Sequence, residues 1–221
     1  MAGIRYYATL WRSVVAFTLV LSCSIGLANA GPGEDFAAGM ISYKRADFAS
    51  AMPLLRKAAD AGHPEAQAVL ASILDAADSD EEAAAYYRKA ADAGNLDGVF
   101  GLGTMLATGD GVKQDVAEAR VLITRAAEGG HREAIKELAL AYIQGSLGIP
   151  EDQRKGKDAL KWISLAADTD FLVALEELER AYRVGDYGLA SDLKRADLLK
   201  QKIMKLKGVK DRKSRRRGEK E

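Results

Sequence analysis

The chain contains few of the residue types on which most enzymes and metal proteins depend. Its 221 residues include one cysteine, Cys23, and only two histidines, His63 and His131. One cysteine cannot form a disulfide within the chain, and two histidines with one cysteine fall short of the four ligands of a structural zinc site. No serine stands in a G-x-S-x-G sequence. The sequence therefore predicts no catalytic residue, no cofactor and no metal ligand.

The chain also lacks an apolar run long enough for an ordinary membrane span. Its longest run, Val14–Leu27, follows Arg5 and Arg12 and precedes Ala28-Asn29-Ala30. A basic start, a short apolar run and a small-x-small ending are typical of a secretory signal peptide. We expect residues 1–30 to be a signal peptide cleaved after Ala30, which predicts a periplasmic or secreted protein.

Two alternatives for this leader stay open. The run could be retained as a membrane anchor, although it is shorter than the roughly 20 residues that a bilayer needs. Val20-Leu21-Ser22-Cys23 also loosely resembles a lipobox, which would give a lipoprotein anchored at Cys23. Each of the three alternatives places the rest of the chain outside the cytoplasm.

A net charge of zero conceals a strong asymmetry along the chain. Residues 31–193 contain 28 acidic and 17 basic residues, a net charge of −11. Residues 194–221 contain 13 basic and 4 acidic residues, a net charge of +9. An acidic body is therefore followed by a basic C-terminal segment.

Internal repetition is the strongest pattern in the sequence. The heptapeptide RKAADAG occurs at residues 56–62 and again at residues 88–94. An Ala-Ala pair recurs four times, and a small residue follows each pair eight positions later. The pairs are Ala58-Ala59, Ala90-Ala91, Ala126-Ala127 and Ala166-Ala167, and the small residues are Ala66, Gly98, Ala134 and Ala174. Such self-similarity at a nearly fixed period indicates a repeat architecture.

The repeated residues predict helix pairs. Each small residue is followed four positions later by leucine, so these residues share one helix face. Gly62, Gly94 and Gly130 suit helix ends that need a left-handed residue, and the alanines allow two helices to approach closely. We expect an all-α, right-handed α-solenoid of about five antiparallel helix pairs within residues 31–207. The pairs are expected at residues 34–61, 63–93, 95–129, 131–168 and 170–207.

Two local features carry further expectations. His63 and His131 directly follow a helix-stop glycine, where the third unit has Asn95, so all three are predicted to be turn or helix-start residues. The third unit contains Gly98, Gly101 and Gly103 in one short helix, and each glycine costs about 1 kcal/mol relative to alanine. We therefore expect this unit to be held by packing and to be the most mobile.

The repeats resemble the Sel1-like family, which is related to the tetratricopeptide repeats. The segments Gly98–Gly103 and Gly109–Asp115 follow the family pattern closely, as do Ala134, Leu138 and Tyr142. This resemblance implies a protein–protein adaptor or scaffold, several of which act in bacterial envelopes. One cysteine-rich branch of the family is linked to β-lactam hydrolysis, but its paired cysteines are absent here. The fifth unit departs from the pattern at Glu179 and is expected to cap the array.

The resemblance also suggests a binding surface, because the first helix of each tetratricopeptide-like pair lines a concave groove. The partner-binding candidates are Phe100, Thr104, Lys136, Leu140, Ile143, Glu176, Arg180 and Arg183. The apolar members among them would suit a peptide helix flanked by charges. The alternative, that these same residues form core between repeats, stays open.

Residues 208–221 are predicted to be a basic disordered tail, because almost no apolar residue follows Val209. Its candidate contacts for anionic lipid or envelope polymer are Lys210, Arg212, Lys213, Arg215, Arg216 and Arg217. Alternatively, the tail only keeps the chain soluble or folds back on the acidic body. The secretion signal argues against nucleic acid as a partner.

The leading functional hypothesis is a non-enzymatic periplasmic scaffold that binds another protein or peptide of the cell envelope. The alternative is a peripheral binder of anionic lipid or polymer that works through the tail. A β-lactamase-like enzyme is the least favoured hypothesis.

Overall fold

The computed structural model describes residues 31–208 and consists there of ten α-helices and one short 3-10 helix. The first helices of the five pairs are α2 (Pro32–Lys44), α4 (Pro64–Asp75), α6 (Leu96–Thr108), α8 (Arg132–Gln144) and α10 (Leu172–Val184). The second helices are α3 (Phe48–Asp60), α5 (Asp80–Asp92), α7 (Val116–Glu128), α9 (Lys157–Asp168) and α11 (Leu193–Leu206), and η1 (Glu151–Gln153) precedes α9. The expected all-α solenoid of five helix pairs is confirmed.

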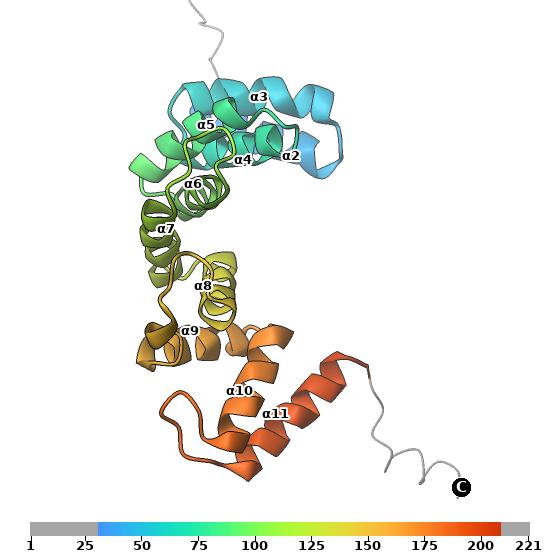
Figure 1. Cartoon of the computed structure of the whole chain (residues 1–221). Coiled ribbons are helices and arrows are strands. Elements are labelled where there is room, and N and C mark those ends of the chain that lie inside the picture. The colour runs from blue at the N-terminus through green and yellow to red at the C-terminus, as the bar shows by residue number, and fades with distance from the viewer. Residues whose placement is uncertain (1–30, 209–221) are drawn as a thin grey trace, which may run out of the picture.

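The five pairs stack in an arc (Figure 1). Helices α3, α5, α7 and α9 follow the outer side of the arc, and the first helices lie on its inner side. Each helix packs mainly on its neighbours in the chain, and the first helices also contact one another, α4 with α6 and α8 with α10. The inner surface is therefore built from segments that lie about one repeat apart in the sequence.

The repeated alanines form the joints between helices, as their spacing predicts. All eight residues of the Ala-Ala pairs are buried, and none is more than 4% exposed. Gly62, Gly94 and Gly130 adopt φ values of +89°, +82° and +88° directly after these helices. Backbone N–H groups of the turn then donate to carbonyls of the Ala-Ala pair, for example the N–H of Asn95 to the carbonyl of Ala90 at 2.9 Å. Small side chains and a left-handed residue, glycine at three joints and Asp170 at the fourth, thus allow the chain to reverse direction within a few residues.

The glycines of α6 permit especially close packing in the third unit. A Cβ added at Gly98 would lie 2.5 Å from the Cβ of Ala90 and 2.9 Å from the nitrogen of Ala91. One added at Gly101 would lie 2.3 Å from the Tyr87 ring. Packing therefore offsets the weak helix propensity of this segment, as expected. The greater mobility expected for this unit stays a prediction.

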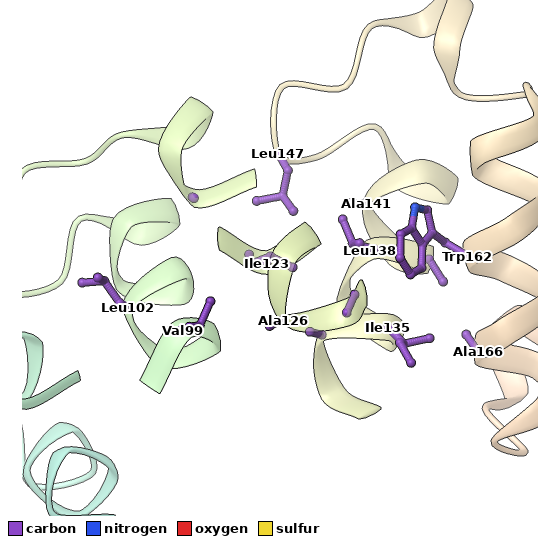
Figure 2. Packing of buried hydrophobic residues seen from close by; sticks show 14 of the residues in the cluster. Val99, Leu102, Ile123, Ala126, Ile135, Leu138, Ala141, Leu147, Trp162 and Ala166 are labelled. Carbon is purple, nitrogen blue, oxygen red and sulfur yellow. The ribbon is translucent and has the colours of Figure 1, made fainter. Parts of the chain in front are cut away.

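Buried side chains continue without interruption from unit to unit. Figure 2 shows Val99 and Leu102 of α6, Ile123 of α7, Leu138 of α8 and Trp162 of α9 within one cluster of hydrophobic side chains. At about 25 cal/mol per Å² of apolar surface removed from water, this burial is the main stabilising contribution. No helix pair could bury these faces alone, so each unit depends on its neighbours.

The loops between paired helices are anchored more firmly than their variable length suggests. Leu147 and Ile149 of the long fourth loop are buried in the core. In the third, fourth and fifth units, a loop side chain also donates to the carbonyl two residues before the glycine that ends the first helix. These bonds join Gln114 to Ala107, Arg154 to Ile143 and Ser191 to Arg183, at 2.8, 2.9 and 3.0 Å. Different residue types in loops of different length therefore bind the carbonyl at the same position of the helix end.

The two ends of the array pack less tightly than its middle. Of α11, only Ala196 and Ile203 are buried. Large apolar side chains are exposed at both ends, among them Phe48 in α3 and Leu198 in α11. At Glu179, where the family pattern has a small residue, the carboxylate binds Arg183 at 2.5 Å, and Arg183 also reaches Asp197 of α11. This ion-paired contact between α10 and α11 is consistent with a terminal unit that caps the array.

Candidate functional site: two grooves on the inner surface

Two grooves lie along the first helices. The groove of the second to fourth units has a volume of about 440 Å³. It is lined by Ala68, Val69, Ser72, Asp75, Tyr87, Asp97, Phe100, Gly101, Thr104, His131 and Glu133. Because it contains three carboxylates and no lysine or arginine, we call it the acidic groove. The other, of about 540 Å³, is lined by Tyr142, Ile143, Glu151, Arg154, Lys155, Glu177, Arg180 and Tyr187, and we call it the mixed groove.

Helix-start histidines position the aromatic side chains of the inner surface. The Nδ1 atoms of His63 and His131 accept from the N–H groups of Ala66 and Ala134, at 3.4 and 3.1 Å. These bonds cap α4 and α8, as Asn95 caps α6, so the expected helix-start role of the three residues is confirmed.

Each of these histidine rings packs against a phenylalanine of the preceding first helix. His63 lies 4.7 Å from Phe36, and His131 lies 4.7 Å from Phe100, between ring centroids. Because Nδ1 of His131 accepts a backbone hydrogen bond, its proton resides on Nε2, which donates to Asp97 at 3.0 Å. The cap, the ring contact and the hydrogen bond to Asp97 together hold His131 against Phe100 at the acidic groove.

The wall of the acidic groove at α5 and α6 is closely packed. The ring of Tyr87 occupies the space left by the missing side chain of Gly101. Burial raises the pKa of Tyr87 to about 12, so its hydroxyl remains neutral at physiological pH. Tyr87 therefore contributes a rigid apolar wall to the groove and no charge.

Asp75 gives one edge of the acidic groove its negative potential. Burial raises the pKa of Asp75, and the nearby carboxylates of Asp80, Asp110 and Asp78 raise it further. Within residues 31–208, none of these four carboxylates forms an ion pair. Asp75 also lies at the C-terminal end of α4, where the helix dipole favours a cation. This edge is therefore suited to a positively charged partner group.

The mixed groove is held by internal ion pairs. Arg180 binds Glu177 at 2.5 Å and Asp186 at 3.1 Å, and Lys155 binds Asp186 at 2.8 Å. Hydrogen bonds from Lys155, from the N–H of Tyr187 and from Arg180 lower the pKa of Asp186 to about 2. The Tyr187 hydroxyl donates to Glu177 at 2.6 Å. Most charges of this groove are therefore compensated within the protein.

The structure distributes the eight partner-binding candidates over different surroundings. Phe100 and Thr104 line the acidic groove, and Ile143 and Arg180 line the mixed groove. Lys136, Leu140, Glu176 and Arg183 line neither groove. All eight are half-buried except the exposed Glu176, which pairs with Lys207, the residue that directly follows α11. Phe100 and Ile143 also pack against the core, so groove and core roles coincide in both residues.

Sequence reasoning missed several groove residues. Asp75, Tyr87 and His131 line the acidic groove, and Arg154 and Tyr187 line the mixed one. One usable signal exists, because Phe36 with His63 and Phe100 with His131 occupy corresponding positions of their units. The position of Asp75 depends on how α4 and α6 pack, for which the sequence offered no comparable repeat.

A serine–lysine spacing that sequence reasoning overlooked has a structural role here. Ser191 and Lys194 match S-x-x-K, the spacing at which β-lactamases hold their nucleophile. The Ser191 hydroxyl instead donates to the carbonyl of Arg183 at 3.0 Å. Ser191 thus helps to close the end of α10.

Other predicted features lie outside the described residues. They are the leader, residues 1–30, and the tail candidates Lys210, Arg212, Lys213, Arg215, Arg216 and Arg217. Within residues 31–208, no helix combines the length and apolar character of a membrane span. In the same range no cluster of three or more histidine, cysteine or acidic side chains is arranged to hold a metal ion.

Stacked helix pairs with capped, closely packed joints and a continuous inner surface define an α-solenoid repeat protein. Sel1 repeats match residues 41–63, 64–95, 97–131 and 132–169, and the chain belongs to the Sel1 repeat family. Such repeats generally mediate protein–protein interaction and typically form a non-enzymatic scaffold.

Solved structures agree with this fold. A protective antigen of uropathogenic Escherichia coli with an SLR fold has a TM-score of 0.69 at 23% identity, covering 79% of this chain and 38% of that one. A Sel1 repeat protein from Oxalobacter formigenes has a TM-score of 0.63 at 26% identity, covering 79% and 71%. A Sel1 repeat protein from Klebsiella pneumoniae has a TM-score of 0.53 at 22% identity, covering 80% of this chain and 88% of that one.

A similar sequence occurs in chitin synthase regulatory factor 2 of Schizosaccharomyces pombe, which is 30% identical over 107 residues. The similarity covers 48% of this chain and 21% of the length of the yeast protein.

Proposed function

We propose that this chain is a non-enzymatic scaffold that binds a partner protein along its inner surface. The observation that carries the proposal is the acidic groove, in which half-buried Val69, Phe100 and Thr104 lie beside the carboxylates of Asp75 and Asp97. Half-buried aromatic and aliphatic side chains provide apolar contact area, and carboxylates at the edge select a basic partner.

We further propose that the protein works outside the cytoplasm, in a bacterial cell envelope. Support comes from the basic start, short apolar run and small-x-small ending of residues 1–30. A protein partner in that compartment would meet the inner surface of the arc.

The test places a photo-crosslinking residue, p-benzoylphenylalanine, at Thr104 in the full-length chain inside cells. The matched control carries the same residue at Val121, which is 64% exposed on α7. We expect a discrete protein adduct from Thr104 that is absent from Val121. Identical adducts from both positions, or none from Thr104, would contradict the proposal.

A second candidate function is binding of anionic lipid or polymer through the C-terminal segment. The observation in its favour is α11, whose Lys194, Lys200 and Lys205 are exposed and form no ion pair within the described residues. Each basic residue near an anionic surface contributes about 1 kcal/mol. Co-sedimentation with phosphatidylglycerol vesicles should then depend on the basic residues of 209–221 and weaken with salt.

A further inference from the structure

The acidic groove and the C-terminal segment have complementary charge. The groove lining contains three carboxylates and no lysine or arginine. Glu133 pairs with Lys136 and Asp97 accepts from His131, which leaves Asp75 without an ion pair among the described residues. Residues 209–221 contain seven lysines and arginines and three acids, a net charge of +4, and no apolar residue after Val209. The mixed groove already contains Arg154, Lys155 and Arg180, so it offers no comparable attraction.

The lining of the acidic groove suits arginine in particular. An arginine that pairs with Asp75 would lay its alkyl stem on half-buried Val69 and Phe100, which line the same groove. Phe100 also offers an aromatic face to a guanidinium group. Arg215, Arg216 and Arg217 are consecutive, so at least one of them can point toward such a site in an extended segment.

The position of the last helix makes an intramolecular contact geometrically reasonable. Helix α11 runs back toward the first units, and its C-terminal end lies on the open, inner side of the arc (Figure 1). Thirteen residues follow Gly208. A fully extended segment of this length spans about 45 Å. This is about twice the length of one helix of the arc.

From these observations we propose that residues 209–221 bind in the acidic groove of their own chain and compete there with a partner. The segment would then act as an internal, charge-selected occupant that a more strongly bound partner displaces. This inference builds on the proposed function of the groove, but it can fail while that function stands.

The first experiment uses the full-length, purified chain with p-benzoylphenylalanine at Thr104, and with the same residue at Val121 as control. Irradiation at low protein concentration should give an adduct between position 104 and a peptide from residues 209–221 within one chain. Mass spectrometry identifies the peptide, and electrophoresis separates monomers from crosslinked pairs. Adducts only between two chains, or equal adducts from position 121, would overturn the proposal.

The charge requirement is tested in the same assay. We expect the adduct to fall about fivefold in Asp75→Asn, the factor for loss of one surface ion pair. It should fall further in R215Q/R216Q/R217Q. Glu128→Gln is the matched control, because Glu128 is exposed on α7 and outside both grooves.

The adduct should also weaken from about 0.1 M to about 1 M salt, over which the Debye length falls from about 10 Å to about 3 Å. An adduct that withstands the arginine substitutions would refute charge-selected docking.

The consequence for partner binding separates the two proposals. In cells, R215Q/R216Q/R217Q should increase the Thr104 adduct with the partner protein by freeing the groove. If the partner adduct forms but does not change in this variant, the groove binds a partner and the internal occupant is wrong. If the tail adduct forms and no partner adduct appears, the scaffold proposal fails alone.

Discussion

At the scale of single residues, this fold depends on small side chains at contacts between helices. Gly98 illustrates the point, because its missing side chain allows α6 to lie against the end of α5. The corresponding residues of other units are Ala66, Ala134 and Ala174, all completely buried. The third unit therefore joins its neighbour more closely than the others do.

We predict that Gly98→Ala destabilises the protein by about 1–2 kcal/mol. The new Cβ would meet Ala90 and the backbone of Ala91, and this overpacking outweighs a helix-propensity gain of about 1 kcal/mol. Gly33→Ala is the control, because the nearest atom to its added Cβ is 3.9 Å away. Urea unfolding should show a loss for Gly98→Ala only, and an equal response of both variants would show that the close contact relaxes freely.

The capping role of His131 gives a second prediction at this scale. His131→Ala should cost about 1 kcal/mol, because the N–H of Ala134 loses its acceptor. His131→Asn should cost less, because Asn95 caps α6 in the same way with a bond of 2.9 Å to Gly98. Thermal unfolding compares the two variants. Equal losses would mean that the stack on Phe100, rather than the cap, supplies the stability.

At the scale of elements, the loops connect successive units as well as paired helices. Lys155 precedes α9 and Asp186 follows α10, and their ion pair at 2.8 Å joins the fourth unit to the fifth. Arg180 of α10 binds the same carboxylate. A loop that varies in length between units thus makes a specific contact with the next unit.

The ion pairs of Asp186 predict a defined pH dependence. Because its folded-state pKa of about 2 lies below the ordinary value of 3.8, its stabilisation is present above about pH 4 and is lost as the pH falls toward 2. Asp186→Asn should reduce stability at pH 7 by about 0.5–1 kcal/mol, the range for exposed ion pairs. The difference from the unmodified chain should shrink between pH 4 and pH 2.

Urea unfolding at several pH values measures this difference. Glu128→Gln serves as control, since Glu128 forms no ion pair within residues 31–208. A pH-independent difference for Asp186→Asn would show that packing, rather than charge, accounts for its effect.

At the scale of the whole molecule, stability should be greatest in the middle of the array. Internal units are packed on both sides, whereas the first and last units have one neighbour. The burial pattern agrees, because α2 contains only Asp35 and Gly39 as buried residues and α11 only Ala196 and Ile203.

We therefore predict that amide hydrogen exchange is fastest in α2 and α11 and slowest from α5 to α9. This order also tests the expectation that the glycine-containing third unit is the most mobile. Exchange in α6 faster than in α11 would support that expectation and would show that glycine propensity dominates over neighbour packing. Mass spectrometry of peptides from the exchanged protein measures the exchange of α6 and α11 separately and so distinguishes the two outcomes.

The helix pairs, their boundaries and their joints could be predicted from the sequence alone. The Ala-Ala pairs recur at all four joints, a left-handed glycine follows three of them, and His63, Asn95 or His131 then begins the next helix, because each of these residues carries out a local task at its joint. Their roles depend on neighbours within a few residues, so the repeat itself reveals them.

The grooves were decided only by tertiary structure. Asp75 and His131 line one groove although they lie 56 positions apart in the sequence, because α4 packs on α6 and the His131 ring at the start of α8 contacts Phe100 of α6. Loop contacts such as Arg154 on the carbonyl of Ile143 likewise depend on how a long loop folds back. Local periodicity predicts which face of a helix is buried, but the curvature of the stack determines which exposed side chains of different units meet.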